Sequence, residues 1–101
     1  MLEETFQAGV VKLARFHGFS LIYHTHDSRR SAPGFPDLVL VSPRSGRVLY
    51  RELKTMKGRV SPAQQEWLDG LTAAGQDAGV WRPADLDTGR ILQDLRNTPT
   101  S

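Results

Sequence analysis

Two strongly apolar segments joined by a short turn are the feature of this sequence that most limits its possible folds. Residues 38–41 read Leu-Val-Leu-Val, residues 47–54 resume a strand-like pattern, and the intervening Pro-Arg-Ser-Gly is typical of a turn. The pattern predicts a β-hairpin whose first strand begins at Asp37 and is buried on both faces. In that register the numbers of opposed residues sum to 89, so Asp37 faces Glu52.

The rest of the chain predicts helices and two further strands around this hairpin. Ser61, followed by proline and then Gln64, is typical of a helix N-terminus with a capping box. The expected elements are a helix over 2–17, a strand over 19–24, the hairpin, a helix from Ser61 to Gly75, a strand over 78–82 and a helix over 85–95. We therefore expect a mixed α+β (α/β) fold with a small mixed four-stranded sheet flanked by helices, in the order α-β-β-β-α-β-α.

Length and composition limit the classes of protein to consider. The chain has 101 residues, which is the size of one domain, and 39% of them are hydrophobic, which is typical of a globular protein. No apolar run approaches the ~18–20 residues of a membrane span, and the absence of cysteine excludes disulfides and cysteine chemistry. We expect one soluble, cytoplasmic domain over residues 1–96 and a frayed tail over residues 97–101.

Basic residues are concentrated in the middle of the chain. Residues 24–59 contain eight lysines and arginines against three acidic residues, a net charge of +5, whereas the remainder sums to −3. Such a basic centre favours a polyanionic partner, because lysine and arginine release counterions when they bind phosphates. Arg29, Arg30, Lys57 and Arg59 stand in predicted loops where they could contact nucleic-acid phosphates, although ordinary solvated loop charges would look the same.

Two opposed carboxylates with a lysine nearby are unusual on a strand that should fill a core. Asp37 and Glu52 would repel each other unless a cation were bound, and Lys54 points to the same face as Glu52. A hard divalent ion such as Mg²⁺ would fit, since it takes oxygen ligands and binds through one or two carboxylates. The alternative is that Lys54 simply neutralises Glu52 at an exposed strand end.

The residues around this cluster resemble a known nuclease family. Gly34-Phe35-Pro36-Asp37 followed by Glu52-Leu53-Lys54 resembles the PD-(D/E)xK nuclease signature. The segment over residues 57–68, Gly75, and Glu3 with Gln7 in the first helix are similar to the VRR-NUC (virus-type replication-repair nuclease) branch of that superfamily. The resemblance implies the restriction-endonuclease-like core fold.

The resemblance also implies a role for each matching residue. Asp37 and Glu52 correspond to the metal-binding acids, with the main-chain carbonyl of Leu53 completing the set, and Lys54 to the lysine that activates or orients the attacking water. Gln64 corresponds to a glutamine near the active site, although capping Ser61 is an equally good reason for its presence. Glu3 is a further candidate metal ligand, with Glu4 as the neighbouring alternative and helix-dipole stabilisation as the structural explanation.

These inferences predict an enzyme, with one alternative from a different class. We expect an endonuclease that requires Mg²⁺ or Mn²⁺, hydrolyses phosphodiester bonds in branched DNA and resolves Holliday junctions as a homodimer during replication or repair. A bacterial cell or a virus-infected host cell would be its setting. The alternative is a non-catalytic nucleic-acid-binding module with the same fold, which the two opposed acids disfavour because binding alone would select basic residues.

Overall fold

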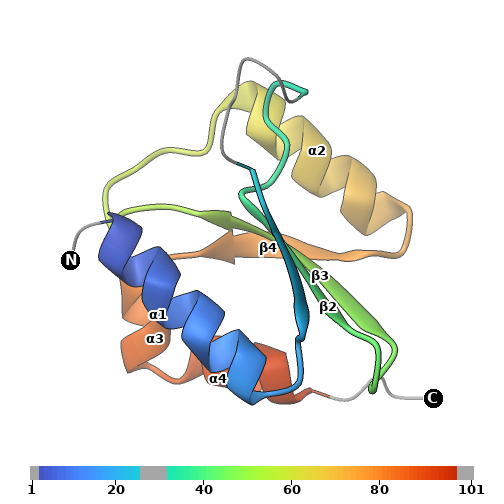
Figure 1. Ribbon diagram of the computed structural model, residues 1–101. Helices are drawn as coiled ribbons and strands as arrows, with labels where there is room; N and C mark the ends of the chain where they lie inside the picture. Colours follow the sequence, from blue (N-terminus) through green and yellow to red (C-terminus); the bar gives the residue numbers. More distant parts are fainter. Residues whose placement is uncertain (1–2, 26–31, 98–101) are drawn as a thin grey trace.

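The computed structural model describes residues 3–25 and 32–97 and places a four-stranded mixed sheet between helices (Figure 1). The elements are α1 (Glu3–Phe16), β1 (Leu21–His24), β2 (Leu38–Ser42), β3 (Arg47–Leu53), α2 (Pro62–Ala73), β4 (Asp77–Trp81), α3 (Pro83–Asp87) and α4 (Arg90–Arg96). The strand order is β1-β2-β3-β4, with β1, β2 and β3 antiparallel and β4 parallel to β3. The expected fold class is confirmed. None of the helices in the described ranges is long and apolar enough to cross a bilayer.

The hairpin register agrees with the prediction from the turn. Leu38 pairs with Arg51 and Val41 with Val48, so the numbers of opposed residues sum to 89. Gly46 accommodates the turn with a φ of +71°. Strand β2 begins at Leu38, so Asp37 lies immediately before it rather than within it. The register still directs Asp37 toward Glu52.

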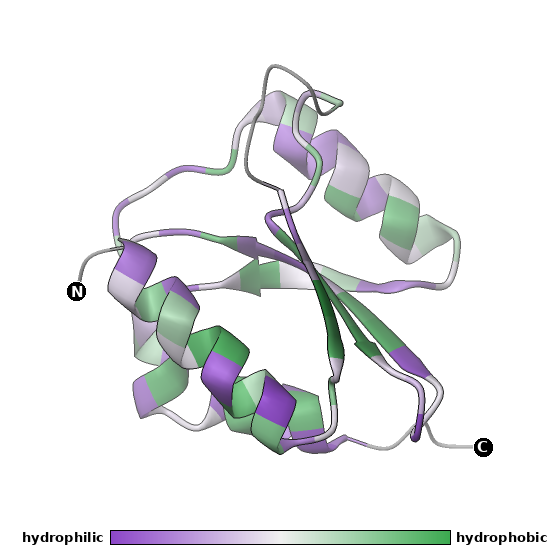
Figure 2. Cartoon of the chain, viewed as in Figure 1, coloured by the Kyte–Doolittle hydropathy of each residue, from purple (hydrophilic) through white to green (hydrophobic). Residues whose placement is uncertain are grey.

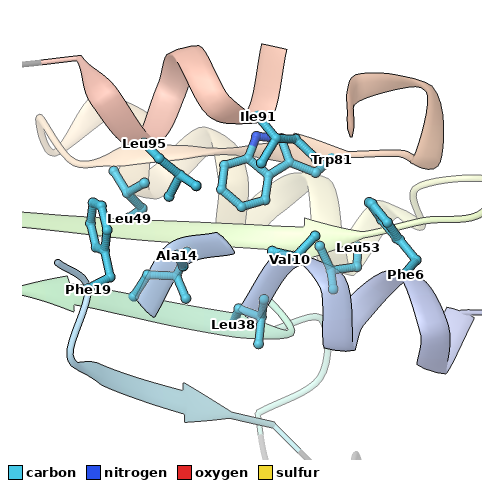
Figure 3. Packing of buried hydrophobic residues seen from close by; sticks show 11 residues of the cluster. Phe6, Val10, Ala14, Phe19, Leu38, Leu49, Leu53, Trp81, Ile91 and Leu95 are labelled. Atoms are coloured by element: carbon cyan, nitrogen blue, oxygen red, sulfur yellow. The ribbon is translucent and has the colours of Figure 1, made fainter. Parts of the chain in front are cut away.

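The core lies on the face of the sheet that α1 and α4 cover (Figure 3). Helix α1 contributes a buried stripe at helical spacing, and β2 and β3 contribute alternate residues from the opposing sheet. The cluster consists of Phe6, Val10, Ala14, Phe19, Leu38, Leu40, Leu49, Leu53, Trp81, Ile91 and Leu95.

The opposite face of the sheet is covered unevenly, and this corrects one prediction. Helix α2 packs against β4 on the side away from α1 and α4 (Figure 1). In β2 the even-numbered residues are buried, but Val39 and Val41 are only half-buried. The strand is therefore not buried on both faces, because α2 packs against β4, which lies at the opposite edge of the sheet from β1.

The predicted C-terminal helix is wrong in one respect. Residues 85–95 form the end of α3 and most of α4 rather than one continuous helix. Gly89 has a φ of +82°, a left-handed conformation that interrupts the helix. The break lets α4 turn so that Ile91 and Leu95 enter the core.

Candidate active site

Asp37 and Glu52 meet where β2 begins beside the end of β3. The carboxylate atom Oδ2 of Asp37 accepts a hydrogen bond of 2.8 Å from the backbone nitrogen of Leu53. Extending the ladder by one pair beyond Leu38 and Arg51 sets Asp37 opposite Glu52, and alternation along the strands places both side chains on the face opposite the core. The hairpin thus brings together the two carboxylates, as its register predicted.

Glu52 is a buried carboxyl group whose pKa is strongly raised. Its side chain is 1% exposed, and its Oε2 atom has no hydrogen-bond partner in the described part of the chain. Burial, together with the hydrogen bond and charge of Asp37, raises the pKa of Glu52 from 4.5 to about 9, while the nearby charge of Lys54 lowers it. Without a cation, Glu52 is therefore protonated at neutral pH. A buried carboxylate with a free oxygen beside a second carboxylate has the character of a ligand pair for a cation.

Lys54 follows β3 directly and is held by the neighbouring strand. Its backbone nitrogen donates to the carbonyl oxygen of Trp81 at 3.0 Å, which continues the parallel pairing of β3 and β4 by one residue. Alternation along the strand places the Lys54 side chain on the same face as Glu52, and it is half-buried there. Two carboxylates and one ammonium group therefore converge at the end of β3.

The segment before Asp37 is anchored to α2. Trp67 donates from Nε1 to the carbonyl of Pro33 at 3.1 Å, and its ring packs edge-on against Phe35 with 5.1 Å between centroids. Gly34 lies so close to the first turn of α2 that a Cβ there would stand 2.4 Å from the carbonyl carbon of Ala63. Trp67 is half-buried, and through these two contacts it anchors the segment before Asp37 to α2.

The segment before Asp37 is also held by Thr25, the residue that directly follows β1. Thr25 donates from Oγ1 to the carbonyl of Pro36 at 3.0 Å, and its backbone nitrogen donates to the carbonyl of Asp37 at 2.9 Å. Asp37 is therefore positioned from three directions, by β1, β3 and α2.

Gln64 forms the capping box that the sequence predicts. Its side-chain Oε1 accepts from the Ser61 backbone nitrogen at 2.8 Å, and its own backbone nitrogen donates to Ser61 Oγ at 3.2 Å. The capping explanation of this residue is confirmed, and a role in the site remains a prediction.

The other predicted site residues are placed differently. Glu3 is the first residue of α1, and its side chain lies outside the described part of the structure, as do Arg29 and Arg30 entirely. Lys57 and Arg59 are exposed on the connection between β3 and α2. Among the described residues, no group of three or more histidines, cysteines or acids forms a ready metal cage. The described candidate for a cation is the Asp37–Glu52 pair.

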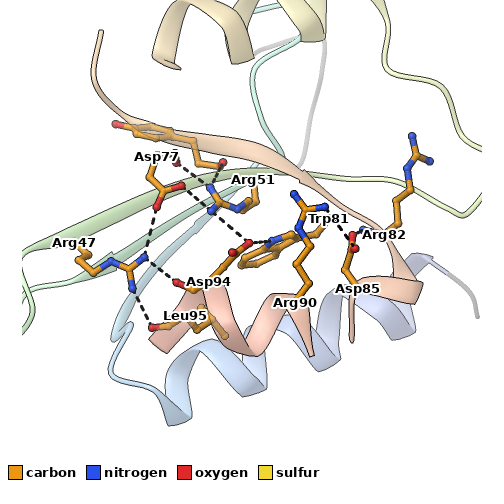
Figure 4. A network of polar contacts seen from close by, with 10 residues as sticks. Arg47, Arg51, Asp77, Trp81, Arg82, Asp85, Arg90, Asp94 and Leu95 are labelled. Atoms are coloured by element: carbon orange, nitrogen blue, oxygen red, sulfur yellow. Dashed lines mark hydrogen bonds and ion pairs between the residues drawn. The ribbon is translucent and has the colours of Figure 1, made fainter. Parts of the chain in front are cut away.

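Arg47 and Arg51 correct the interpretation of the basic centre (Figure 4). Arg51 is 4% exposed, binds Asp77 through Nη2 at 2.7 Å and lies over the Trp81 ring at 4.9 Å. Arg47 is also buried and donates to the carbonyls of Asp94 and Leu95. These two arginines hold β3, β4 and α4 together, so they add nothing to a surface for a polyanion.

Comparison with known proteins reveals a consistent set of relatives. The family model described as the VRR-NUC domain matches residues 3–85. The Fanconi-associated nuclease 1 homolog of Schizosaccharomyces pombe is 34% identical over 56 residues, which are 55% of this chain and only 8% of that protein.

Solved structures share the fold. A VRR-NUC domain protein superimposes with a TM-score of 0.70 at 22% identity, covering 98% of this chain and 93% of the other. Hjc, described as a Holliday junction resolvase from the archaeal hyperthermophile Archaeoglobus fulgidus, gives a TM-score of 0.52 at 23% identity over 79% of this chain and 67% of the other.

Proposed function

The chain belongs to the VRR-NUC family of nuclease domains, and from that premise we propose that it is a divalent-metal-dependent DNA endonuclease. The observation that carries this proposal is the pair of carboxylates at the end of the hairpin. Glu52 is buried, one of its oxygens has no hydrogen-bond partner among the described residues, and Asp37 contacts it. A fold that needed only to bind DNA would gain nothing from burying a carboxyl group there.

Asp37, Glu52 and the carbonyl of Leu53 would hold Mg²⁺ or Mn²⁺. In a β-strand, the N–H and the C=O of one residue point to the same side of the strand. The N–H of Leu53 points to Asp37, so the carbonyl of Leu53 also points to the side where Asp37 lies. All the donors are oxygens, which suits a hard cation. When bound, the ion would polarise the phosphate and lower the pKa of an attacking water. Glu3 is the candidate for one further ligand.

Lys54 would act on the substrate side of the two carboxylates. Its ammonium lies near enough to Glu52 to lower the pKa of that carboxyl. From there it can orient the attacking water and offset the charge that develops on the scissile phosphate. Gln64 lies in the first turn of α2, beside the Gly34 segment, and would assist from that side.

Basic residues outside the buried ion pairs would contact the DNA backbone. With Arg47 and Arg51 buried in ion pairs, the candidates are Lys57 and Arg59 beside Lys54, together with Arg29 and Arg30. Phosphate contacts of this kind give salt-dependent affinity without reading sequence.

We extend the proposal to branched DNA and to a homodimer. The fold of the Hjc resolvase supports a branched substrate, and two symmetric incisions require two active sites.

A dimer is supported by the face of β1, β2 and β3 that points away from the core, where Leu21 and Tyr23 are each 59% exposed. Figure 2 shows apolar stretches along these strands. The side chains that share this face are Leu21, Tyr23, Val39, Val41, Val48 and Tyr50.

The test is cleavage of labelled four-way junction, flap and linear duplex DNA with Mg²⁺, Mn²⁺ or EDTA. The wild type and the exposed-carboxylate control Asp87→Ala should make paired cuts in the junction with either metal and none with EDTA. Asp37→Ala should cut nothing. Binding of all substrates without cleavage would overturn the enzyme proposal in favour of a binding module.

The oligomeric state is measured separately by sedimentation equilibrium. The wild type should sediment as a dimer, and the double variant Leu21→Lys with Tyr23→Lys as a folded monomer. A monomeric wild type would overturn the dimer and leave the nuclease proposal intact.

A further inference from the structure

Arg82 makes contacts that nothing in the proposed chemistry has yet used. It follows β4 directly and lies at the opposite end of that strand from Asp77 (Figure 4). Its Nη1 donates two hydrogen bonds, at 2.5 Å to the carbonyl of Thr55 and at 2.7 Å to the carbonyl of Gly58. A single guanidinium nitrogen thus joins the two ends of the turn over residues 55–58.

The same turn is held from a second side. Gly58 closes the turn by donating from its backbone nitrogen to the Thr55 carbonyl at 3.3 Å. At its apex, Met56 accepts through its sulfur from the backbone nitrogen of Ala84 at 3.4 Å. Since Ala84 and Arg82 both belong to the start of α3, the turn is fastened to that helix at its apex and at both ends.

This turn packs against the side chain of Lys54. A Cβ built on Gly58 would lie 3.5 Å from Cδ of Lys54, so the Gly58 backbone stands beside the aliphatic stem of the lysine, at most one C–C bond farther away. The Lys54 backbone is already fixed by its bond to Trp81. The turn therefore restricts the remaining freedom of Lys54, which is the direction of its stem.

We propose that Arg82 is a positioning residue, which clamps the turn over residues 55–58 and through it holds the Lys54 ammonium over the two carboxylates. This inference rests on the proposed nuclease function for its catalytic consequence. An arginine suits the task because its planar guanidinium offers fixed donors, whereas a lysine ammonium at this position would be less well oriented.

The first experiment measures the clamp without any activity. Trypsin can cut the turn after Lys57 and the following connection after Arg59, but it does not cut at Arg82 because Pro83 follows. Arg82→Ala should be cut at these two sites at least about tenfold faster than the wild type, as followed by mass spectrometry. Arg96→Ala removes an exposed arginine from the end of α4 and should be cut at the wild-type rate. Equal rates for Arg82→Ala and the wild type would overturn the clamp.

The second experiment measures the effect on the reaction. Under single-turnover conditions with saturating junction DNA, Arg82→Ala should cleave about 10- to 100-fold more slowly, since small misplacements of a reacting group have effects of this size. The DNA dissociation constant should change by less than about threefold, because Lys57 and Arg59, the proposed phosphate contacts, remain. Arg82→Lys should regain part of the lost rate.

The outcomes separate the two proposals. Faster proteolysis with an unchanged cleavage rate would overturn the positioning role and leave a purely structural clamp. A wild type that cuts no DNA would overturn the proposed function together with the catalytic part of this inference, while proteolysis still decides the clamp. Circular dichroism and thermal melts confirm that each variant is folded, and Arg82→Gln replaces Arg82→Ala if the alanine variant is not.

Discussion

The backbone nitrogen of Leu53 donates a 2.8 Å hydrogen bond to Oδ2 of Asp37, so strand β3 itself holds the carboxylate that precedes strand β2. The bond joins the residue before Leu38 to the second residue after Arg51, just beyond the last ladder pair. It ties the position of Asp37 to the register of the hairpin. The geometry of the site is therefore a property of the hairpin and follows from its pairing.

Asp37→Asn and Asp37→Ala should separate the two roles of this carboxylate. Asparagine keeps an oxygen that can accept from Leu53, so Asp37→Asn should melt within a few degrees of the wild type yet lose roughly 100-fold or more of the cleavage rate. Asp37→Ala leaves the Leu53 N–H without that acceptor and should lose a further 1–3 kcal/mol or so of unfolding free energy. Equal stability of the two variants in urea titrations would argue against the bond to Leu53.

Glu52→Gln should change how the stability of the metal-free protein depends on pH. The pKa of Glu52 is about 9 in the folded state against 4.5 ordinarily, so the folded protein binds the proton more tightly. The contribution of this proton to the unfolding free energy is complete below pH 4.5 and is lost as the pH rises through about 9. Between pH 5 and pH 8 in EDTA, the wild type should lose on the order of 4 kcal/mol more unfolding free energy than Glu52→Gln. The exposed-site control Glu66→Gln should follow the wild type, and parallel curves for wild type and Glu52→Gln would contradict the raised pKa.

Metal binding should release a proton from Glu52. Because the carboxyl is protonated at neutral pH without a cation, Mg²⁺ or Mn²⁺ must displace that proton in order to bind. The apparent affinity for Mn²⁺ should therefore increase from pH 6 to pH 8. Calorimetric titrations in two buffers of different ionisation enthalpy should show about one proton released per ion in the wild type. Affinity that is independent of pH would remove Glu52 from the set of ligands.

Gly34→Ala should disturb the site through packing. Gly34 has a φ of +82°, and an added Cβ would stand 2.4 Å from the Ala63 carbonyl carbon at the start of α2. The anchored segment must shift, so we expect a loss of at least about 2 kcal/mol and a slower cleavage rate. Gly46→Ala is the matched control, with a φ of +71° and nothing within 4 Å of the added atom. It should lose only about 1 kcal/mol and retain the rate. Similar losses in the two variants would show that backbone strain alone matters.

Arg51→Met should destabilise the fold without weakening the salt-dependent part of DNA binding. The change removes the 2.7 Å bond to Asp77 and the bonds to the carbonyls of Tyr50 and Asp77, while the half-exposed Asp77 carboxylate keeps Arg47 at 3.5 Å, so it should lose about 1–3 kcal/mol of unfolding free energy. Arg44→Met, at an exposed position in the hairpin turn, should change stability by less than about 0.5 kcal/mol. Plots of binding against salt at a temperature where both variants are folded should have the same slope for Arg51→Met and the wild type. A shallower slope for Arg51→Met would place that arginine on the DNA surface.

The features that could be predicted from the sequence depend on residues close together in the chain. The turn before Arg47 and the apolar runs on either side determined the hairpin register, and with it the opposition of Asp37 and Glu52. Ser61 and Gln64 determined the helix cap, because both hydrogen bonds of a capping box lie within one turn of helix. These interactions are complete within a few residues, so local patterns are sufficient to predict them.

Other features were decided only when distant segments packed together. Arg51 and Lys57 are both basic residues of the same stretch, yet one is buried and the other exposed, because β4 brings Asp77 beside Arg51. Trp67 donates to the Pro33 carbonyl, which is 34 residues away in the sequence. Arg82 donates to the Thr55 carbonyl in the turn over residues 55–58, which is 27 residues away. Hydrogen-bond donors and charges require partners once they are buried, and which partner arrives is determined by the packing of the sheet against its helices. The sequence therefore determined the pair of acids, and the tertiary structure determined what surrounds and positions them.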